Sequence, residues 1–289
     1  MPASSITQLP ITKVSKAAST ETSDALAIEE PLEIRLEYGP ISNRQVQNVS
    51  VTMRTPGHDA ELALGFLFTE GVIQKKDNVI AVDHCFIACA ENKENVIQIA
   101  LNEATIPNLR NAERNFYTTS SCGVCGKGSI NAIRTVSTYN NKQQEDNFIN
   151  ASLLHRLPAI LSSHQKIFAD TGGLHASALF TANGELLLVR EDVGRHNALD
   201  KLIGAALNKS WLPLNKTILL LSGRASFELV QKAAMAGITV IAAVGAPSSL
   251  AVQLAEEFNI TLIGFLRNER FNIYTAAHRI LIPDYETTH

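Results

Sequence analysis

The chain has 289 residues, of which 45% are hydrophobic and 18% are charged, and its formal net charge at pH 7 is −3. This composition is typical of a globular protein and gives no electrostatic reason to expect binding to nucleic acid. No apolar run approaches the roughly 20 residues that span a bilayer, and residues 1–30 lack the apolar segment of a secretory signal. We therefore expect a cytoplasmic protein that does not associate with a membrane.

The chain up to residue 147 is predicted to form a tail and a small α+β subdomain. Residues 1–30 show no hydrophobic periodicity, which is typical of a disordered tail. In the subdomain, residues 31–147, a helix is expected over 59–70, where apolar residues precede Gly71. The expected strands cover residues 32–38, 46–54, 79–86 and 96–101, and a weaker one covers 114–118. The polar stretch 139–147 is interpreted as a linker.

Residues 148–289 are predicted to form an α/β domain. A helix is expected over 151–163, and Ala182-Asn183-Gly184 predicts a hairpin turn between strands at 175–181 and 185–190. After this hairpin, helices and strands alternate. The helices are expected at 196–207, 227–236 and 248–257, and the strands at 217–222, 239–244 and 261–265. Because these strands are apolar throughout and are separated by helices, they indicate a buried parallel sheet.

The segment 120–126 contains two cysteines, Cys122 and Cys125, in a C-x-x-C arrangement. A thiolate is the nucleophile in sulfur transfer, and a helix N-terminus lowers the pKa of a thiol below its free value of about 8.5. A helix at 127–134 would provide such an end. We therefore predict a reactive thiol at Cys122 or Cys125.

Two other interpretations of this cysteine pair stay open. A C-x-x-C pair is often half of a zinc site, and Cys85 and Cys89 would then supply the other half. The second alternative is an inert structural pair. Cys85 and Cys89 themselves are expected to be buried core residues, because free cysteine is often fully buried.

Polar side chains gather where the predicted hairpin enters the next helix. The segment 190–197 contains six polar residues, among them Asp192 and His196, and polar groups at strand ends line the ligand crevice of open α/β sheets. The alternative is a solvated helix cap formed by Asp192 or Asn197. His175, where a glycine loop meets a strand, is as well explained as a satisfied core histidine as by a functional role.

Small-residue turns follow the next two predicted strands. The turns 222–226, which contains Arg224 and Ser226, and 245–249 enter helices whose free N–H groups favour an anion. Arg267 and Arg270 come just after the last predicted strand and would bind a phosphate or a carboxylate. Each feature alone is equally consistent with a cap or a surface charge. Together they predict one crevice for a phosphorylated ligand.

These segments together resemble the FdhD family, the sulfur carrier proteins needed for formate dehydrogenase activity. The resemblance extends from about Pro31 to Arg279. It is carried by the motifs Leu64-Gly65-Phe66-x4-Gly71, Cys122-Gly123-Val124-Cys125-Gly126, Thr171-Gly172-x2-His175-Ala176, the segments 191–201 and 224–232, Gly264-Phe265 through Arg270, and Tyr274-Thr275.

The resemblance implies a sulfurtransferase that takes sulfur from a cysteine desulfurase as a persulfide. Cys122 would carry the persulfide and Cys125 would assist or resolve it. The acceptor would be the molybdenum cofactor in its bis(molybdopterin guanine dinucleotide) form, before insertion into formate dehydrogenase. The family also implies a homodimer. A zinc-stabilised chaperone that binds this cofactor without sulfur transfer stays the alternative.

The resemblance also assigns the residues that bind the nucleotide part of this cofactor. The assigned segment consists of Phe265, Leu266, Arg267, Asn268, Glu269 and Arg270. The ligand-contact role is better supported for Arg267 and Arg270 than for Leu266 or Asn268. The strand-end residues expected to join them are Arg224, Ser226, Asp192, His196 and His175. No permanent metal site is expected.

The larger domain of the family resembles the cytidine deaminase fold, which agrees with a hairpin followed by alternating helices and strands. Deaminase chemistry itself requires an H-x-E motif and a P-C-x-x-C helix start. In His175-Ala176-Ser177, serine stands where the glutamate should be, and the turn 222–226 contains no cysteine. We therefore expect the fold without zinc hydrolysis.

Overall fold

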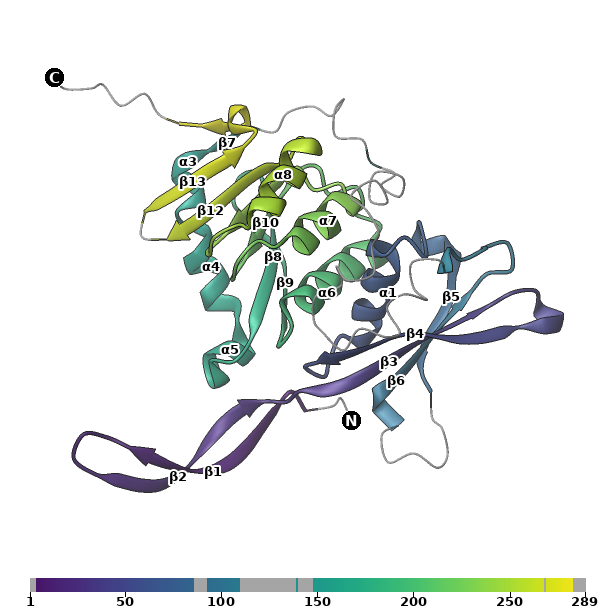
Figure 1. The fold of residues 1–289 in the computed structure, drawn as a ribbon, viewed down its shortest axis with the longest axis horizontal. Helices are drawn as coiled ribbons and strands as arrows, with labels where there is room; N and C mark the ends of the chain where they lie inside the picture. The colour runs from purple at the N-terminus through teal and green to yellow at the C-terminus, as the bar shows by residue number, and fades with distance from the viewer. Residues whose placement is uncertain (1–3, 86–92, 110–138, 140–147, 268, 283–289) are drawn as a thin grey trace.

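The protein has a mixed α/β fold with two main sheets (Figure 1). The computed structural model describes residues 4–85, 93–109, 139, 148–267 and 269–282. Several sequence predictions therefore lie outside the described residues: Cys89, Cys122, Cys125, Asn268, the strand at 114–118 and the helix at 127–134. Within the described residues, no helix is long and apolar enough to cross a membrane.

A four-stranded sheet forms the core of the N-terminal unit. Its strands lie in the order β4-β3-β6-β5. They are β3 (Glu30–Tyr38), β4 (Gln45–Arg54), β5 (Val79–His84) and β6 (Val96–Leu101), and helix α1 (Asp59–Thr69) follows β4. Alternate residues of β3, from Leu32 through Ile34 to Leu36, are fully buried, while Glu33 and Arg35 lie on the other face. This period of two confirms the strand predicted there.

A six-stranded sheet forms the centre of the C-terminal unit, in the order β13-β12-β11-β10-β8-β9. Its strands are β8 (His175–Thr181), β9 (Leu186–Asp192), β10 (Thr217–Leu221), β11 (Val240–Ala243), β12 (Thr261–Arg267) and β13 (Arg270–Thr275). Strands β10, β11 and β12 are parallel to one another, whereas β8 pairs with β10 and β13 pairs with β12 in antiparallel fashion. The sheet is therefore mixed, with the predicted parallel strands in its middle. Its resemblance to the cytidine deaminase fold stays a prediction.

Helices cover both faces of this larger sheet (Figure 1). One face carries α6 (Arg195–Asn208), α7 (Phe227–Met235) and α8 (Ser249–Glu257), and the other carries α3 (Ala151–Leu154) and α4 (Leu157–His164), followed by α5 (Lys166–Thr171). Along β10, Leu219 and Leu221 belong to the first core while Ile218 and Leu220 belong to the second. Burial on both faces explains why these strands are apolar throughout.

The two units share one apolar core across the α1–α6 helix crossing. The first core contains residues of β3, β6 and α1 together with residues of α6, α7 and the larger sheet. The crossing is close because a Cβ added at Gly65 would lie 1.9 Å from the Asp200 carbonyl oxygen, and one at Gly204 would lie 1.9 Å from that of Glu61. Glycine at both positions therefore brings the two backbones into contact.

The predicted disordered tail is wrong for residues 6–27. They form an antiparallel hairpin of β1 (Ile6–Val14) and β2 (Ser19–Ala27), paired from Ile6 with Ala27 to Val14 with Ser19. The hairpin extends away from the body of the molecule (Figure 1). Most of its side chains are exposed on both faces, so its sequence carries no alternation of apolar and polar residues.

Two further differences from prediction occur in the C-terminal unit. The helix expected at 151–163 is broken into α3 and α4, because Pro158 lies in the first turn of α4 and a proline ring clashes with the preceding turn of a continuous helix. Strand β13 was not predicted, and it forms a hairpin with β12. The short strands β7 (Ile149–Asn150) and β14 (Ile280–Leu281) pair in parallel beside them.

Candidate functional site

The loops that follow the strands of the larger sheet converge at one edge. Strands β9, β10, β11 and β12 end there, and β8 begins there, because β8 is antiparallel to both of its neighbours. Backbone hydrogen bonds join the loops: Gly245 N–H donates to the Gly223 carbonyl at 2.9 Å, and Phe265 N–H donates to the Gly245 carbonyl at 3.1 Å. The predicted strand-end segments therefore lie together.

A cluster of polar side chains stands at this edge where α6 and α7 begin. The His196 Nε2 atom lies 2.8 Å from Glu228 Oε2 and 3.3 Å from Ser226 Oγ. Burial alone would raise the pKa of Glu228, but the hydrogen bond and charge of His196, the charge of Arg195 and the hydrogen bond from Ser226 together outweigh it, and the pKa is lowered. The sequence predicted His196 and Ser226 as site residues and missed Glu228.

His175 lies beside this cluster at the start of β8. Burial lowers the pKa of His175, and the nearby positive charge of Arg195 acts in the same direction. A Cβ added at Gly223 would lie 3.3 Å from His175 Nδ1, so the β10–α7 turn packs directly against the imidazole. His175 is half-buried and stays compatible with either role considered for it.

Two arginines surround the same cluster. Arg224 is exposed in the turn between β10 and α7. Arg195 is half-buried, and its Nε atom is buried without a hydrogen-bond partner among the described residues, as is the Oε1 atom of Glu228. Unpaired buried polar atoms are uncommon in native proteins, and a bound polar group is one way in which they are satisfied.

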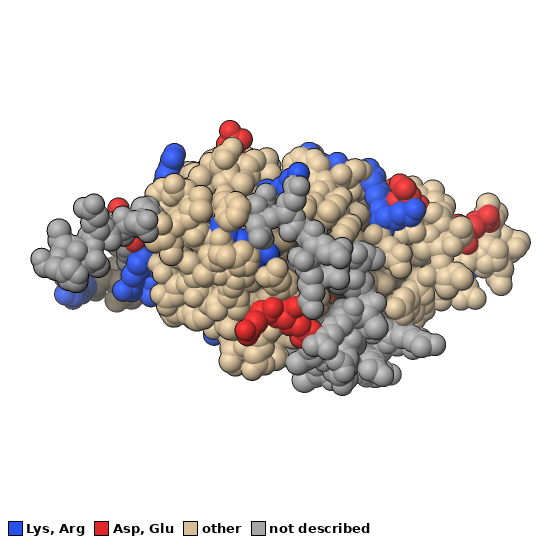
Figure 2. Space-filling model, turned by 90° about the horizontal axis from the view of Figure 1, so that it is seen from above, with Lys and Arg blue, Asp and Glu red and all other residues tan. Residues whose placement is uncertain are grey.

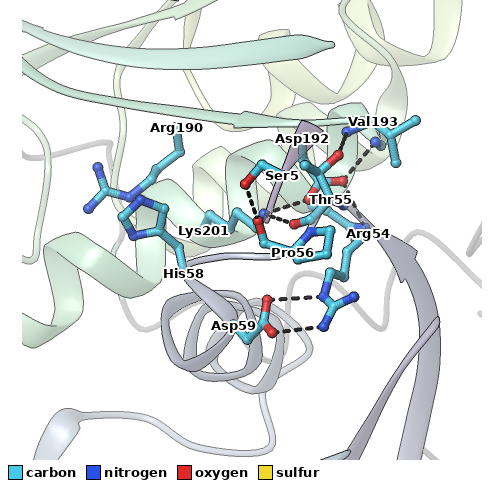
Figure 3. Close-up of polar contacts among 12 residues, drawn as sticks. Ser5, Arg54, Thr55, Pro56, His58, Asp59, Arg190, Asp192, Val193 and Lys201 are labelled. Carbon is cyan, nitrogen blue, oxygen red and sulfur yellow. Dashed lines mark hydrogen bonds and ion pairs between the residues drawn. The ribbon is translucent and has the colours of Figure 1, made fainter. Parts of the chain in front are cut away.

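Asp192 occupies a different environment from the one expected for a ligand-binding residue. It is fully buried, and its carboxylate accepts hydrogen bonds from Thr55 N at 3.2 Å and Gly194 N at 2.8 Å. Lys201 Nζ lies 2.7 Å from Asp192 Oδ2 and donates to the Thr55 carbonyl at 2.8 Å (Figure 3). Its burial and these contacts differ from the exposed position expected at a ligand crevice, and they fix the start of α6. A cofactor-binding role for Asp192 stays a prediction.

This buried pair joins the N-terminal unit to the candidate site. Thr55, between β4 and α1, donates through its amide to Asp192, and its Oγ1 accepts from Val193 N at 3.2 Å. On the other side of the same loop, Arg54 makes a two-pronged contact with Asp59 at 3.1 and 2.9 Å (Figure 3). The loop Thr55-Pro56-Gly57 therefore anchors the N-terminal unit to the candidate site.

The segment assigned to nucleotide binding forms the β12–β13 hairpin. Arg267 and Arg270 lie opposite each other at its tip, and both are exposed. A bulge precedes them, where Phe265 has a φ of 56°, which is rare for a bulky residue. The guanidinium of Arg267 stands 5.9 Å from the centre of the Phe265 ring.

The other members of this segment differ in their accessibility. Glu269 is exposed at the tip of the hairpin, with a φ of 59°. The Leu266 side chain is fully buried in the second apolar core and is not available to a ligand. The hairpin thus presents two cations, Arg267 and Arg270, at the same edge of the sheet as His196.

A second ion cluster lies one helical turn behind His196 and Glu228. Lys232 Nζ contacts both carboxylate oxygens of Asp200, at 3.0 and 2.8 Å, and Thr69 Oγ1 at 3.0 Å. Burial opposes the charge on Lys232, but the carboxylates of Asp200 and Glu70 together outweigh it and the pKa of Lys232 is raised. His196 and Asp200 are four residues apart on α6, and Glu228 and Lys232 are four residues apart on α7. This spacing was the sequence signal that places each pair on one face of its helix.

Of the four cysteines, only Cys85 lies among the described residues. Cys85 follows β5 and is half-buried, not fully buried as expected, with its Sγ 3.4 Å from Gln98 Oε1. The described residues contain no group of three or more side chains able to hold a metal ion. Cys89, Cys122 and Cys125 lie outside them, so the reactive thiol and the zinc site both stay predictions.

Charge is distributed in separate groups on the face shown in Figure 2. Lys and Arg side chains occur there in several places among mostly uncharged atoms, and Asp and Glu side chains gather near the lower centre. This face therefore presents no continuous basic surface among its described residues, such as a nonspecific nucleic-acid interface would need.

Comparison with known proteins gives consistent similarities over most of the chain. Residues 27–281 match the model of a family described as the FdhD/NarQ family. A protein of Mycolicibacterium paratuberculosis named "Sulfur carrier protein FdhD" is 50% identical, with 93% of this chain and 97% of the relative covered. A protein of the same name from Streptomyces avermitilis is 48% identical, with 94% of each chain covered.

A solved structure shares the fold. It is a crystal structure described as a formate dehydrogenase accessory protein from Desulfotalea psychrophila, with a TM-score of 0.71 and 24% sequence identity. The alignment covers 96% of this chain and 99% of the other. At this identity, the likeness supports the fold alone.

Proposed function

Because the chain belongs to the FdhD/NarQ family, we propose that it is a sulfur carrier for formate dehydrogenase. It accepts persulfide sulfur from a cysteine desulfurase on Cys122 and transfers that sulfur to the bis(molybdopterin guanine dinucleotide) form of the molybdenum cofactor. The carrying observation is the identity of 50% to a relative named a sulfur carrier protein, over nearly the full length of both chains.

The proposed chemistry uses two thiols and requires no external oxidant. The Cys122 thiolate attacks the outer sulfur of the donor persulfide, so a new S–S bond forms while the donor S–S bond breaks and the donor leaves as a thiolate. In the second step, Cys125 attacks Cys122 and a disulfide forms. The two electrons released reduce the outer sulfur to sulfide, which becomes a ligand of the substrate molybdenum.

The edge of the larger sheet is the proposed docking site for the cofactor. Arg267 and Arg270 are exposed there, and Arg224 is exposed on the neighbouring turn. Guanidinium groups suit the two negative charges of a pyrophosphate, which supports the assignment. Ser226, His196 and His175 lie among the same loops. The proposed partners are a cysteine desulfurase, formate dehydrogenase and a second copy of the chain.

Mass spectrometry of the full chain tests the proposal. After incubation with a cysteine desulfurase and cysteine, we expect a gain of one sulfur atom on the peptide that contains Cys122. The Cys122→Ala variant should gain none, while the matched Cys85→Ala variant should gain as much as the unchanged protein. Sulfur gain that persists in Cys122→Ala, or stoichiometric zinc in the isolated protein, would favour the zinc-stabilised chaperone instead.

A further inference from the structure

Three buried polar atoms near the start of α6 and α7 have no hydrogen-bond partner among the described residues. They are Arg195 Nε at the first position of α6, Glu228 Oε1 in the first turn of α7, and Ser177 Oγ on β8. The Arg195 atom only donates, an ionised Glu228 oxygen only accepts, and the Ser177 hydroxyl does both. Because buried polar atoms in native proteins nearly always have a partner, this group of atoms indicates a polar ligand.

The three atoms lie in the same region, on the side of β8 that faces α6 and α7. Leu179 packs in the first core with residues of both helices, and Ser177 and His175 share its face because alternate residues of a strand point the same way. Besides burial, the positive charge of Arg195 lowers the pKa of His175. The same charge helps to lower the pKa of Glu228, which burial alone would raise. The Arg195 guanidinium therefore lies near both side chains.

The Glu228 carboxylate is held through one oxygen while the other keeps its capacity to accept. Its Oε2 atom lies 2.8 Å from His196 Nε2 and 3.4 Å from Ser226 Oγ. Although burial acts against it, these partners and Arg195 keep the pKa of Glu228 below its ordinary value, so the carboxylate is ionised at neutral pH. The side chain is 12% exposed. Because the terminal torsion of glutamate is broad, a small rotation turns Oε1 towards solvent.

The charges in this region favour a neutral group over a phosphate. The carboxylate of Glu228 and the guanidinium of Arg195 balance each other, so a phosphate here would be repelled by the carboxylate as much as it is attracted. The exposed Arg224, Arg267 and Arg270 are better placed for phosphate. An acceptor beside a donor instead matches a neutral ring that presents an N–H group next to a carbonyl oxygen.

We propose that Glu228 and Arg195 bind the 2-amino-4-oxopyrimidine edge of the cofactor, an edge that the pterin and guanine rings share. This inference rests on the proposed function, which supplies a ligand that contains both rings. The ring N–H and the neighbouring amine donate to the Glu228 carboxylate, and the ring carbonyl oxygen accepts from Arg195 Nε. An adenine ring has an unprotonated nitrogen beside its amine, so it would place a lone pair against the carboxylate.

The first test compares ligands on the unchanged full chain by isothermal titration calorimetry. GDP is compared with IDP, which lacks the 2-amino group, and with ADP. In a second series, pterin is compared with lumazine, in which a carbonyl replaces the amine. The ring that the pair binds should be held at least about tenfold more tightly than its counterparts, because a site built to hydrogen-bond a group strongly rejects an analogue that lacks it.

The two series distinguish the two sources of this edge. Selectivity for GDP over IDP and ADP would assign the pair to guanine, and selectivity for pterin over lumazine would assign it to the pterin. Either result supports the inference. Equal affinities within both series would overturn it.

A variant of the carboxylate completes the design. Glu228→Gln should lose the ring selectivity yet bind inorganic pyrophosphate as well as before, because pyrophosphate has no ring edge. The matched control Glu256→Gln removes an exposed carboxylate of α8 and should keep the selectivity. Equal weakening of ring and pyrophosphate binding in Glu228→Gln would indicate a purely structural role and overturn the inference.

The outcome is separable from that of the proposed function. If Glu228→Gln does not fold, the comparison of rings on the unchanged protein decides alone. Lost selectivity in a protein that still gains sulfur from the desulfurase would overturn this inference and leave the proposed function standing. Ring selectivity in a protein that gains no sulfur would overturn the proposed sulfur transfer and leave the ring-binding pair standing.

Discussion

Replacing Gly65 by alanine is expected to push α1 and α6 apart. The new Cβ would lie 1.9 Å from the Asp200 carbonyl oxygen and 2.7 Å from its carbon, where ordinary contacts begin at 3.4 Å. The obstacle is helix backbone on both sides, so the helices must separate by about 1.5 Å across the shared core. Overpacking of this kind costs about 1–3 kcal/mol and occasionally more, while alanine regains about 1 kcal/mol of helix propensity over glycine.

Because the obstacle is backbone, we take the upper end of that range and expect a net loss of about 2 kcal/mol. For a chain of 289 residues this lowers the melting temperature by roughly 3 °C. Thermal unfolding followed by circular dichroism measures this change. The matched control is Gly173→Ala, where the nearest atoms are 3.9 Å away and the backbone needs no left-handed conformation. If both variants melt within about 1 °C of each other, the close crossing does not hold α1 against α6.

Three other changes test the anchoring contacts. Lys201→Met leaves the buried Asp192 carboxylate unpaired and should cost about 3–5 kcal/mol in urea unfolding; adding Asp192→Asn should recover part of the loss, and a loss below about 1 kcal/mol would contradict the pairing. Arg190→Gln removes a partner of the Glu61 carboxylate. In the unchanged protein, burial alone would raise the pKa of Glu61, but Arg190 and His58 lower it to about 2. The stabilisation from this lowered pKa is present above the unfolded value of 4.5 and is lost as the pH falls towards 2. The destabilisation by Arg190→Gln should therefore be full at neutral pH and shrink over that range; a constant difference would count against it. Removing residues 1–26 should change the melting temperature by only about 2–4 °C, because that hairpin is mostly exposed, and a larger fall would show that it supports the core.

The order of helices and strands followed from local patterns wherever one face of an element is buried. The alternation in β3 matches burial of one face, and the continuous apolar stretch of β10 matches burial of both faces. Where both faces are exposed, as in β1 and β2, the sequence has no such period and the hairpin was missed. The break at Pro158 could have been read from the sequence, because proline removes a helix hydrogen bond wherever it stands inside a helix.

Part of the candidate site could likewise be predicted from the sequence, and part could not. Residue types and their positions after strands identified His196, Ser226 and Arg224 and predicted that the strand-end segments would meet, because parallel strands end at one edge of a sheet. The sequence could not distinguish a buried aspartate from a ligand-facing one, since the burial of Asp192 depends on Lys201 and on a loop 137 residues away.

The sequence by itself determined the family and those helices and strands whose burial leaves a pattern along the chain, because these depend on residue type and spacing. Only the tertiary structure paired His196 with Glu228, which lies on the next helix, and placed glycine against backbone at the α1–α6 crossing. Residues far apart in sequence come into contact only through the close packing of the folded core, so their pairing cannot be read from spacing along the chain.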